Sequence, residues 1–130
     1  MEWKVLSEFK RSYEVTSKMV EDFAEASFDK NPIHLSDSYA SSTQFKRRIA
    51  HGMLFGSLIS AIIGNDFPGN GTIYLNQYLS FRKPVFLGDI VEIVVKITDI
   101  DEKGWLTLET NCYTDGNAVI EGNALVIPPK

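Results

Sequence analysis

The stretch that decides the fold reads His51-Gly52-Met53-Leu54-Phe55-Gly56-Ser57-Leu58-Ile59-Ser60-Ala61-Ile62-Ile63-Gly64. Nearly all of its residues are apolar or small, so a helix formed by them is apolar on every side rather than along one stripe. A helix of this kind has to be covered on every side. We therefore predict a buried central helix that begins at Gly52, runs to about Ile63 and ends at Gly64-Asn65.

After a loop over 66–71, the sequence changes to the two-residue period of β-strands. Strands are predicted over 72–82, 90–98, 105–113 and 118–127. The turn Thr114-Asp115-Gly116-Asn117 predicts a hairpin, because Asp-Gly suits a type I′ turn. In the first strand, one face is predicted to hold the apolar residues Ile73, Leu75, Leu79 and Phe81.

Three shorter elements are predicted before the central helix. Residues 10–15 are expected to form a short strand, and Thr16 or Ser17 to cap a helix that ends near Ser27-Phe28. Asn31-Pro32 predicts an extended or turn conformation, because proline cannot continue a helix. A further short helix is predicted over 38–44.

One buried helix followed by antiparallel strands predicts a single α+β domain over residues 1–130. The sheet has to curl around the helix in order to cover it, which is the hot-dog architecture. A half-wrapped helix needs a second copy of the chain to complete its cover. We therefore expect a homodimer.

Charge and composition argue against several classes of partner. The net charge of −4 disfavours nucleic acid or an anionic membrane as the main partner, and the basic cluster Lys46-Arg47-Arg48 suits a solvated face. Cys112 is the only cysteine, so no disulfide can form within the chain, which fits a reducing compartment. The N-terminal residues lack the pattern of a signal peptide, and the longest apolar run is shorter than the ~20 residues that span a bilayer. We expect a soluble, cytoplasmic protein.

Asp29 and His34 are the candidate acid–base pair. They flank the turn Asn31-Pro32, and a carboxylate and an imidazole that converge on one water can take its proton near neutral pH. The alternative is that Asp29 caps the turn and His34 is a half-buried structural histidine, which residue types and spacing alone favour.

Gly52 is the candidate for stabilising negative charge. Unpaired N–H groups at a helix N-terminus can bind a developing oxyanion, and a glycine leaves room for a carbonyl group to approach. A glycine needed only to begin the helix is an equally good explanation. Ser57 and Ser60 suit hydrogen bonds to helix carbonyls. With two histidines and one cysteine, no metal is expected.

These residues resemble the MaoC-like, (R)-specific enoyl-CoA hydratase family. The resemblance covers most of the chain and rests on an aromatic residue, the motif Asp-x-Asn-Pro-aliphatic-His, a small residue six positions later, and two downstream stretches. In this sequence they are Phe23, Asp29-Lys30-Asn31-Pro32-Ile33-His34, Ala40, His51-Gly52-Met53-Leu54, and Gly71-Thr72-Ile73-Tyr74-Leu75 with Phe81 and Pro84-Val85-Phe86-Leu87-Gly88-Asp89.

The resemblance implies a hot-dog homodimer that adds water to a trans-2-enoyl-CoA thioester, giving the (3R)-3-hydroxyacyl-CoA, without a cofactor or a metal. It implies that Asp29 and His34 activate the water and that the Gly52 N–H polarises the thioester carbonyl. It also implies that Asn31 and Ser60 orient the pair by hydrogen bonds. The division of proton transfer between Asp29 and His34 stays open.

Phe28 departs from the family pattern, because many members carry glycine directly before the aspartate. Two other functions stay open: a hot-dog acyl-CoA thioesterase and a non-catalytic acyl-thioester binding module. The predicted central helix has no carboxylate, which counts against the thioesterase, and binding alone requires neither Asp29 nor His34. Chain length and pathway, either polyhydroxyalkanoate supply or fatty-acid turnover, stay open. Candidates to bind the coenzyme A phosphates are Lys46, Arg47, Arg48, Arg82 and Lys83.

Overall fold

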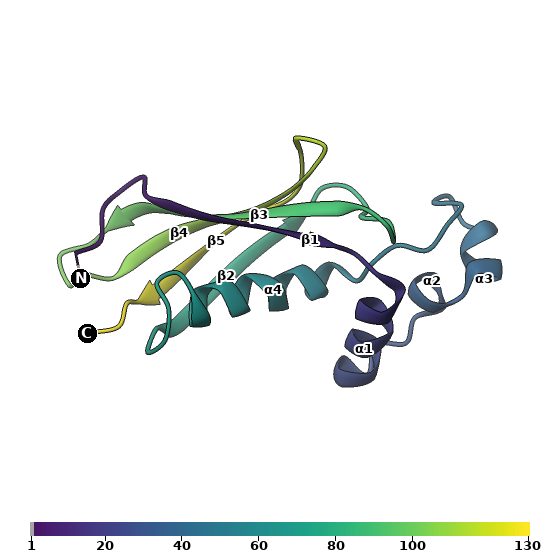
Figure 1. Ribbon diagram of the computed structural model, residues 1–130, viewed down its shortest axis with the longest axis horizontal. Coiled ribbons are helices and arrows are strands. Elements are labelled where there is room, and N and C mark those ends of the chain that lie inside the picture. Colours follow the sequence, from purple (N-terminus) through teal and green to yellow (C-terminus); the bar gives the residue numbers. More distant parts are fainter. Residues whose placement is uncertain (1) are drawn as a thin grey trace.

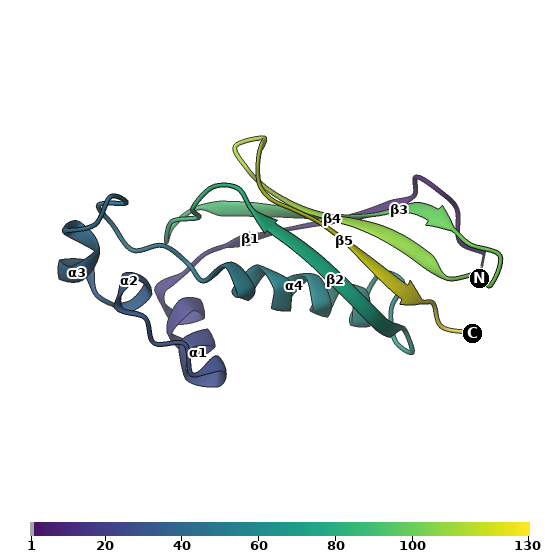
Figure 2. The same ribbon diagram turned by 180° about the vertical axis from the view of Figure 1, so that it is seen from behind.

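A computed structural model describes residues 2–130 of the chain. Five antiparallel strands form one sheet in the order β1-β3-β4-β5-β2, and the helix α4 runs along one face of it (Figures 1 and 2). Three short helices gather beside the N-terminal end of α4, and the two ends of the described chain, residues 2 and 130, lie near its other end. The elements are β1 Glu8–Glu14, α1 Ser17–Ser27, α2 Pro32–Leu35, α3 Asp37–Ser41, α4 Gly52–Asn65, β2 Ile73–Phe81, β3 Ile90–Ile100, β4 Leu106–Thr114 and β5 Asn117–Ile127. This arrangement confirms the predicted α+β hot-dog fold.

Local sequence signals set the bounds of α1. The hydroxyl of Thr16 accepts a hydrogen bond from the Met19 N–H at 3.1 Å, as a helix N-cap does. The helix ends at Phe28, whose φ of 66° is left-handed. Both ends of this helix lie where the sequence predicted them.

The segment after α1 differs from its prediction. Asn31 begins a short helix, α2, rather than only a turn, because its side chain accepts a hydrogen bond from the Ile33 N–H and Pro32 occupies the first turn. The next helix, α3, starts at Asp37 and ends at Ser41, earlier than the predicted 38–44, because Ser36 caps it. Two short helices therefore replace one turn and one helix.

The core lies between α4 and the sheet. Phe55, Ile59 and Ile62 of α4 are fully buried against alternate residues of β3 and β4. Within one chain the sheet packs on one face of α4 only, so the helix is half-wrapped, and the other face is the one that the predicted second copy would cover. Met53 is 59% exposed, and Ser57, Ser60 and Ala61 are exposed as well.

The predicted face of β2 is also wrong in part. A β-bulge interrupts the pairing of β2 with β5 between Tyr74 and Asn76, which changes the side on which successive residues lie. Tyr74 and Leu79 therefore both pack against the core, whereas Ile73 and Leu75 are exposed.

The hairpin between β4 and β5 confirms the predicted turn chemistry. Asp115 and Gly116 have φ values of 49° and 79°, as the two central residues of a type I′ turn require. Among residues 2–130, no helix is both long enough and apolar enough to cross a membrane.

Candidate active site

A cleft of about 460 Å³ opens at the N-terminal end of α4. Its walls include the start of α4, the end of β2 and the segment between α1 and α2. The structure thus brings together three of the predicted site residues from separate parts of the chain: Asp29, His34 and Gly52.

Asp29 is placed by the turn that follows α1. The left-handed backbone of Phe28 reverses the chain, and the Asp29 N–H then donates to the hydroxyl of Ser27 at 3.2 Å. The carboxylate of Asp29 accepts a hydrogen bond from the Asn31 N–H at 3.3 Å and is otherwise exposed. The same carboxylate therefore closes the turn and lines the cleft.

The turn also explains the departure at Phe28. A left-handed φ favours glycine, because a Cβ in this conformation lies close to the following carbonyl oxygen. Phe28 adopts this conformation with its side chain 85% exposed. Phe28 in place of glycine therefore makes the left-handed conformation of this turn less favourable in free energy and adds an apolar surface beside Asp29. It does not fill the cleft.

His34 lies on α2 with 9% of its surface exposed. Its Nδ1 atom is 2.7 Å from the carbonyl oxygen of Ile49, and a carbonyl can only accept, so Nδ1 carries the hydrogen and Nε2 is free in the neutral ring. Burial lowers the pKa of His34 below its ordinary value, and the neighbouring His51 lowers it further, against the opposing effects of the Ile49 hydrogen bond and of Asp29. His34 is therefore neutral near pH 7.

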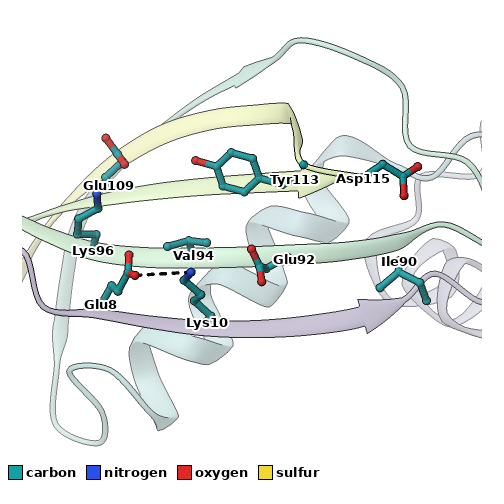
Figure 3. Close-up of a pocket in the computed structure, with 10 residues that line it drawn as sticks. Glu8, Lys10, Ile90, Glu92, Val94, Lys96, Glu109, Tyr113 and Asp115 are labelled. Carbon is teal, nitrogen blue, oxygen red and sulfur yellow. Dashed lines mark ion pairs between the residues drawn. The ribbon is translucent and has the colours of Figure 1, made fainter.

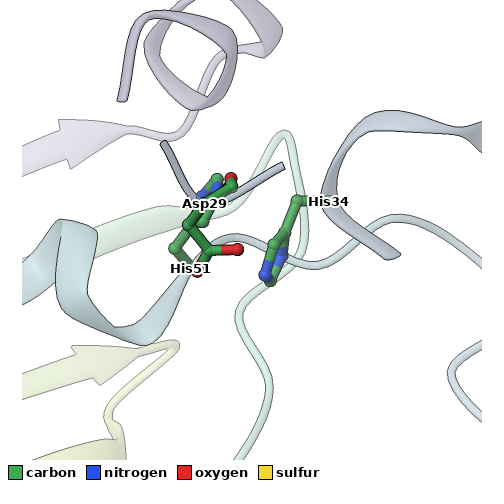
Figure 4. Close-up of side chains that lie close together, drawn as sticks. All are labelled: Asp29, His34 and His51. Atoms are coloured by element: carbon green, nitrogen blue, oxygen red, sulfur yellow. The ribbon is translucent and has the colours of Figure 1, made fainter. Parts of the chain in front are cut away.

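His51 is the site residue to which the sequence analysis assigned no role. It is 1% exposed, its ring stacks on the ring of His34 with centroids 3.8 Å apart, and its Nε2 lies 2.8 Å from the carbonyl oxygen of Asp29 (Figure 4). The sequence offered one signal for a role of His51: it is the only histidine besides His34, and it directly precedes the glycine that begins the central helix.

Gly52 begins α4, and the side chain of His51 makes no capping hydrogen bond there. The Leu54 N–H donates to the carbonyl oxygen of His51 at 3.1 Å, whereas the helix itself offers no partner to the N–H groups of Gly52 and Met53, which are available to a ligand in the cleft. A Cβ added at Gly52 would lie 2.5 Å from Cε1 of Phe81. A side chain at this position would therefore force the Phe81 ring or the start of α4 to shift.

Asn31 contacts Asp29 directly and supports His34 through the helix α2. Its N–H binds the carboxylate of Asp29, and its side chain caps the helix that carries His34. Ser60 lies eight residues after Gly52, roughly 12 Å along the helix axis. It is exposed, and in the described part of the chain it forms no side-chain hydrogen bond with Asp29 or His34.

The basic candidates fall into two groups. Arg48 has a side chain only 11% exposed, donates from Nε to the carbonyl oxygen of His34 at 2.7 Å and lies 3.9 Å from Glu21. It therefore holds the connector against α1 and α2 rather than facing solvent. The candidates that remain accessible are Lys46, which is exposed, Arg47, which lies over the ring of Phe86 at 4.0 Å, and Arg82 and Lys83, which line the cleft.

The three polar side chains of the site lie close enough to test for metal binding. One ligand atom from each of Asp29, His34 and His51 falls within 4.8 Å of the others. An imidazole lone pair lies in the plane of its ring, and the two rings are stacked with only 28° between their planes. Lone pairs of stacked rings do not converge on one ion, so the arrangement fits proton transfer better than metal coordination.

Elsewhere in the molecule, Cys112 and a second hollow do not bring several reactive side chains together in one cleft. Cys112 is fully buried, and burial raises the pKa of its thiol to about 12, which removes it as a nucleophile. A hollow of about 470 Å³ on the opposite face of the sheet is lined by charges of both signs, including Glu8 and Lys10, which pair at 3.7 Å (Figure 3). This second hollow is a solvated mixed-charge surface.

Comparison with known proteins shows the family of the chain. Residues 5–122 match the model of the MaoC-like domain family. The chain is 48% identical over 108 residues to an (R)-specific enoyl-CoA hydratase of Rhodospirillum rubrum, covering 82% of this chain and 75% of that protein. It is 45% identical over 118 residues to a 3-hydroxybutyryl-CoA dehydratase of Methylorubrum extorquens, covering 90% and 75%.

The solved structures agree with the sequences. The (R)-hydratase from Aeromonas caviae involved in PHA biosynthesis matches with a TM-score of 0.94 and 40% identity, covering 98% of each chain. Hydratases and dehydratases are hydro-lyases, so the comparisons confirm the enzyme class expected from the sequence. On the extent of the family match and the identity of these relatives, the chain belongs to the MaoC-like domain family.

Proposed function

We propose that this chain is an (R)-specific enoyl-CoA hydratase, which adds water to a trans-2-enoyl-CoA thioester to give the (3R)-3-hydroxyacyl-CoA. The observation that carries the proposal is the single cleft lined by Asp29, His34 and Gly52. A carboxylate, a neutral imidazole and a helix N-terminus are the groups that this reaction needs. The names of the relatives in R. rubrum and A. caviae support the same reaction.

The chemical step needs one proton removed and one supplied. The oxygen of water forms a bond to C3 of the enoyl group, the C2–C3 π electrons move toward the thioester carbonyl, and C2 then takes a proton. Asp29 and His34 take the proton from water and supply the proton to C2. Nε2 of His34 suits proton exchange, because Nδ1 is occupied by the Ile49 carbonyl.

Gly52 contributes through its backbone. As the π electrons move, negative charge collects on the thioester oxygen, and the free N–H groups at the start of α4 stabilise it. The positive end of the helix dipole acts in the same direction.

The thioester's coenzyme A portion is expected to bind at the basic rim of the cleft. Arg82 and Lys83 line the cleft, and Arg47 lies on the neighbouring Phe86. Arg82 is also 3.3 Å from Glu121, a surface ion pair that a phosphate would replace at small cost. Arg48 is left out of this group because its contacts are internal.

A homodimer is part of the proposal. The exposed face of α4 and the edge strand β2 leave apolar side chains open to solvent, among them Met53, Ile73 and Tyr78. A second copy that covers them would complete the wall around α4 and bring an exposed Ser60 into a buried setting. Light scattering of the purified protein should give twice the mass of 14.6 kDa.

The test is to mix the purified protein with crotonyl-CoA and follow the loss of the conjugated enoyl-thioester absorbance, with chiral analysis of the product. We expect the (3R) alcohol. Asp29→Asn keeps an oxygen for the Asn31 N–H but removes the base, so its rate should fall by about 10²–10⁴-fold. Asp37→Asn, an exposed carboxylate at the start of α3, is the control and should keep the wild-type rate.

Two outcomes would favour the alternatives. Release of free thiol from crotonyl-CoA, without water addition, would indicate a thioesterase. Tight binding of the thioester without turnover in the wild type would favour the binding module. A wild-type rate in Asp29→Asn would reject the mechanism assigned to Asp29.

A further inference from the structure

His51 is a buried titratable side chain for which the proposed reaction has no chemical role. Its ring is 1% exposed and sits between two other rings: it stacks on His34, and its centroid is 5.0 Å from that of Phe23 in an edge arrangement. A buried histidine in contact with a reacting group calls for an explanation in terms of that group.

The first contact of His51 reaches the main chain of Asp29. Because the Asp29 carbonyl can only accept, Nε2 of His51 carries a hydrogen and donates it over 2.8 Å. This hydrogen bond joins the N-terminus of α4 to the turn that holds Asp29. It therefore sets the distance between the Gly52 amide and the Asp29 carboxylate, which come from segments more than twenty residues apart.

The second contact supports His34. The stacked rings lie with centroids 3.8 Å apart, so the face of His51 limits how far the His34 ring can turn (Figure 4). Nδ1 of His51 is buried and has no hydrogen-bond partner within residues 2–130. Within these residues the atom faces no polar group that would hold the ring, so the position of His51 depends on its Nε2–H bond to Asp29 and on its stacking against His34.

We propose that His51 is a positioning residue for the hydration reaction. Its Nε2–H holds the main chain of Asp29, and its ring backs the ring of His34, so that both reacting side chains meet one water in front of the Gly52 amide. This inference rests on the hydratase function proposed above.

Two variants separate the two contacts. His51→Phe keeps an aromatic ring against His34 but removes the donor to Asp29. His51→Gln has an amide nitrogen near the place of Nε2, so it keeps the donor and removes the ring. His51→Phe should lower kcat on crotonyl-CoA about a hundredfold with KM within about twofold, because a misplacement of about 1 Å costs that much. His51→Gln should recover kcat to within about tenfold of wild type, as the hydrogen bond is restored.

A second readout does not depend on turnover. The chain has two histidines, so in either variant the only imidazole signal in NMR belongs to His34. The charged and titratable groups facing His34 are Asp29 and His51, with Arg48 at its carbonyl oxygen. Loss of the His51 ring should raise the pKa of His34 in His51→Gln, and the acid limb of the kcat/KM profile should move to higher pH with it.

Several results would overturn the inference. One is a wild-type kcat in His51→Phe, and another is a kcat of His51→Gln no higher than that of His51→Phe. A third is loss of the circular dichroism of the folded protein in both variants, because a purely structural residue would behave in that way. An inactive wild type would instead reject the proposed function. In that case the NMR titration still decides whether His51 controls His34.

Discussion

The Nδ1 atom of His34 lies 2.7 Å from the carbonyl oxygen of Ile49, and this contact selects the nitrogen that can react. Ile49 belongs to the connector before α4 and forms an isolated β-bridge with Phe86. The connector therefore fixes both the tautomer and the orientation of a side chain on α2. In a site built from separate segments, such a bond gives the imidazole one defined proton-transfer position.

The lowered pKa of His34 predicts the acid limit of activity. Burial holds this pKa below the ordinary value of 6.5, so the neutral form of the ring predominates at pH 6.5 and the charged form predominates only in more acidic solution. We expect kcat/KM for crotonyl-CoA to fall in acidic solution with an apparent pKa below 6.5. An acid limb centred above pH 6.5 would contradict a buried, neutral His34.

The same shift predicts how stability depends on pH. Below pH 6.5 the unfolded chain binds a proton at His34 before the folded chain does, so the free energy of unfolding decreases as the pH falls from 6.5 and levels off below the folded pKa. Urea unfolding measured at several pH values, at one protein concentration, checks this. His34→Gln should lose this part of the pH dependence and keep the part due to carboxylates.

Replacing Phe28 with glycine should stabilise the fold. The residue has a φ of 66°, and its side chain is 85% exposed, so the substitution relieves left-handed strain and loses little packing. We expect a gain of about 1 kcal/mol in the free energy of unfolding. Phe28→Ala is the control, because alanine keeps the strain. An equal gain in both variants would mean that removal of the exposed ring, and not the backbone, is responsible.

Replacing Gly52 with alanine should lower activity more than stability. The new Cβ would lie 2.5 Å from Cε1 of Phe81, so either the half-exposed ring, which lines the cleft, or the start of α4 has to shift. We expect kcat/KM to fall by about 10²-fold, the loss typical of a disturbed oxyanion site.

Two further variants define the cause of that effect. Gly64→Ala adds the same methyl group to α4 where nothing lies within 4 Å, and it should leave activity unchanged. Gly52→Ala combined with Phe81→Ala removes the clash. Recovery of activity in the double variant would show that the ring is responsible, whereas no recovery would point to the methyl group itself blocking the amide.

Gly122 should tolerate alanine poorly, although it does not itself line the cleft. A Cβ there would be 2.3 Å from the carbonyl oxygen of Tyr78 and 3.0 Å from the hydroxyl oxygen of Thr110. Because a backbone atom is in the way, β2 and β5 have to separate, at a cost of about 2 kcal/mol or more. Asn123→Ala, at the exposed neighbouring position of β5, should change the midpoint of urea unfolding only slightly.

The sequence by itself determined the elements whose signals are local. Thr16 caps α1, Asp115-Gly116 forms the type I′ turn, and the apolar run after Gly52 forms α4, because each depends on hydrogen bonds or patterns within a few residues. The proximity of Asp29 and His34 could also be predicted from the sequence. Asn31 and Pro32 begin α2 and place the two residues on either side of its N-terminus.

Only the tertiary structure decided what depends on contacts between distant segments. The bulge at Tyr74 arises from pairing with β5, and Arg48 is removed from the binding candidates because its guanidinium meets α1 and α2. His51 has a role only because folding stacks its ring on His34, seventeen positions earlier in the chain. A one-dimensional pattern records spacing along the chain. Hydrogen bonds and ring stacking act over a few ångströms in space, so these contacts exist only once the segments have packed together.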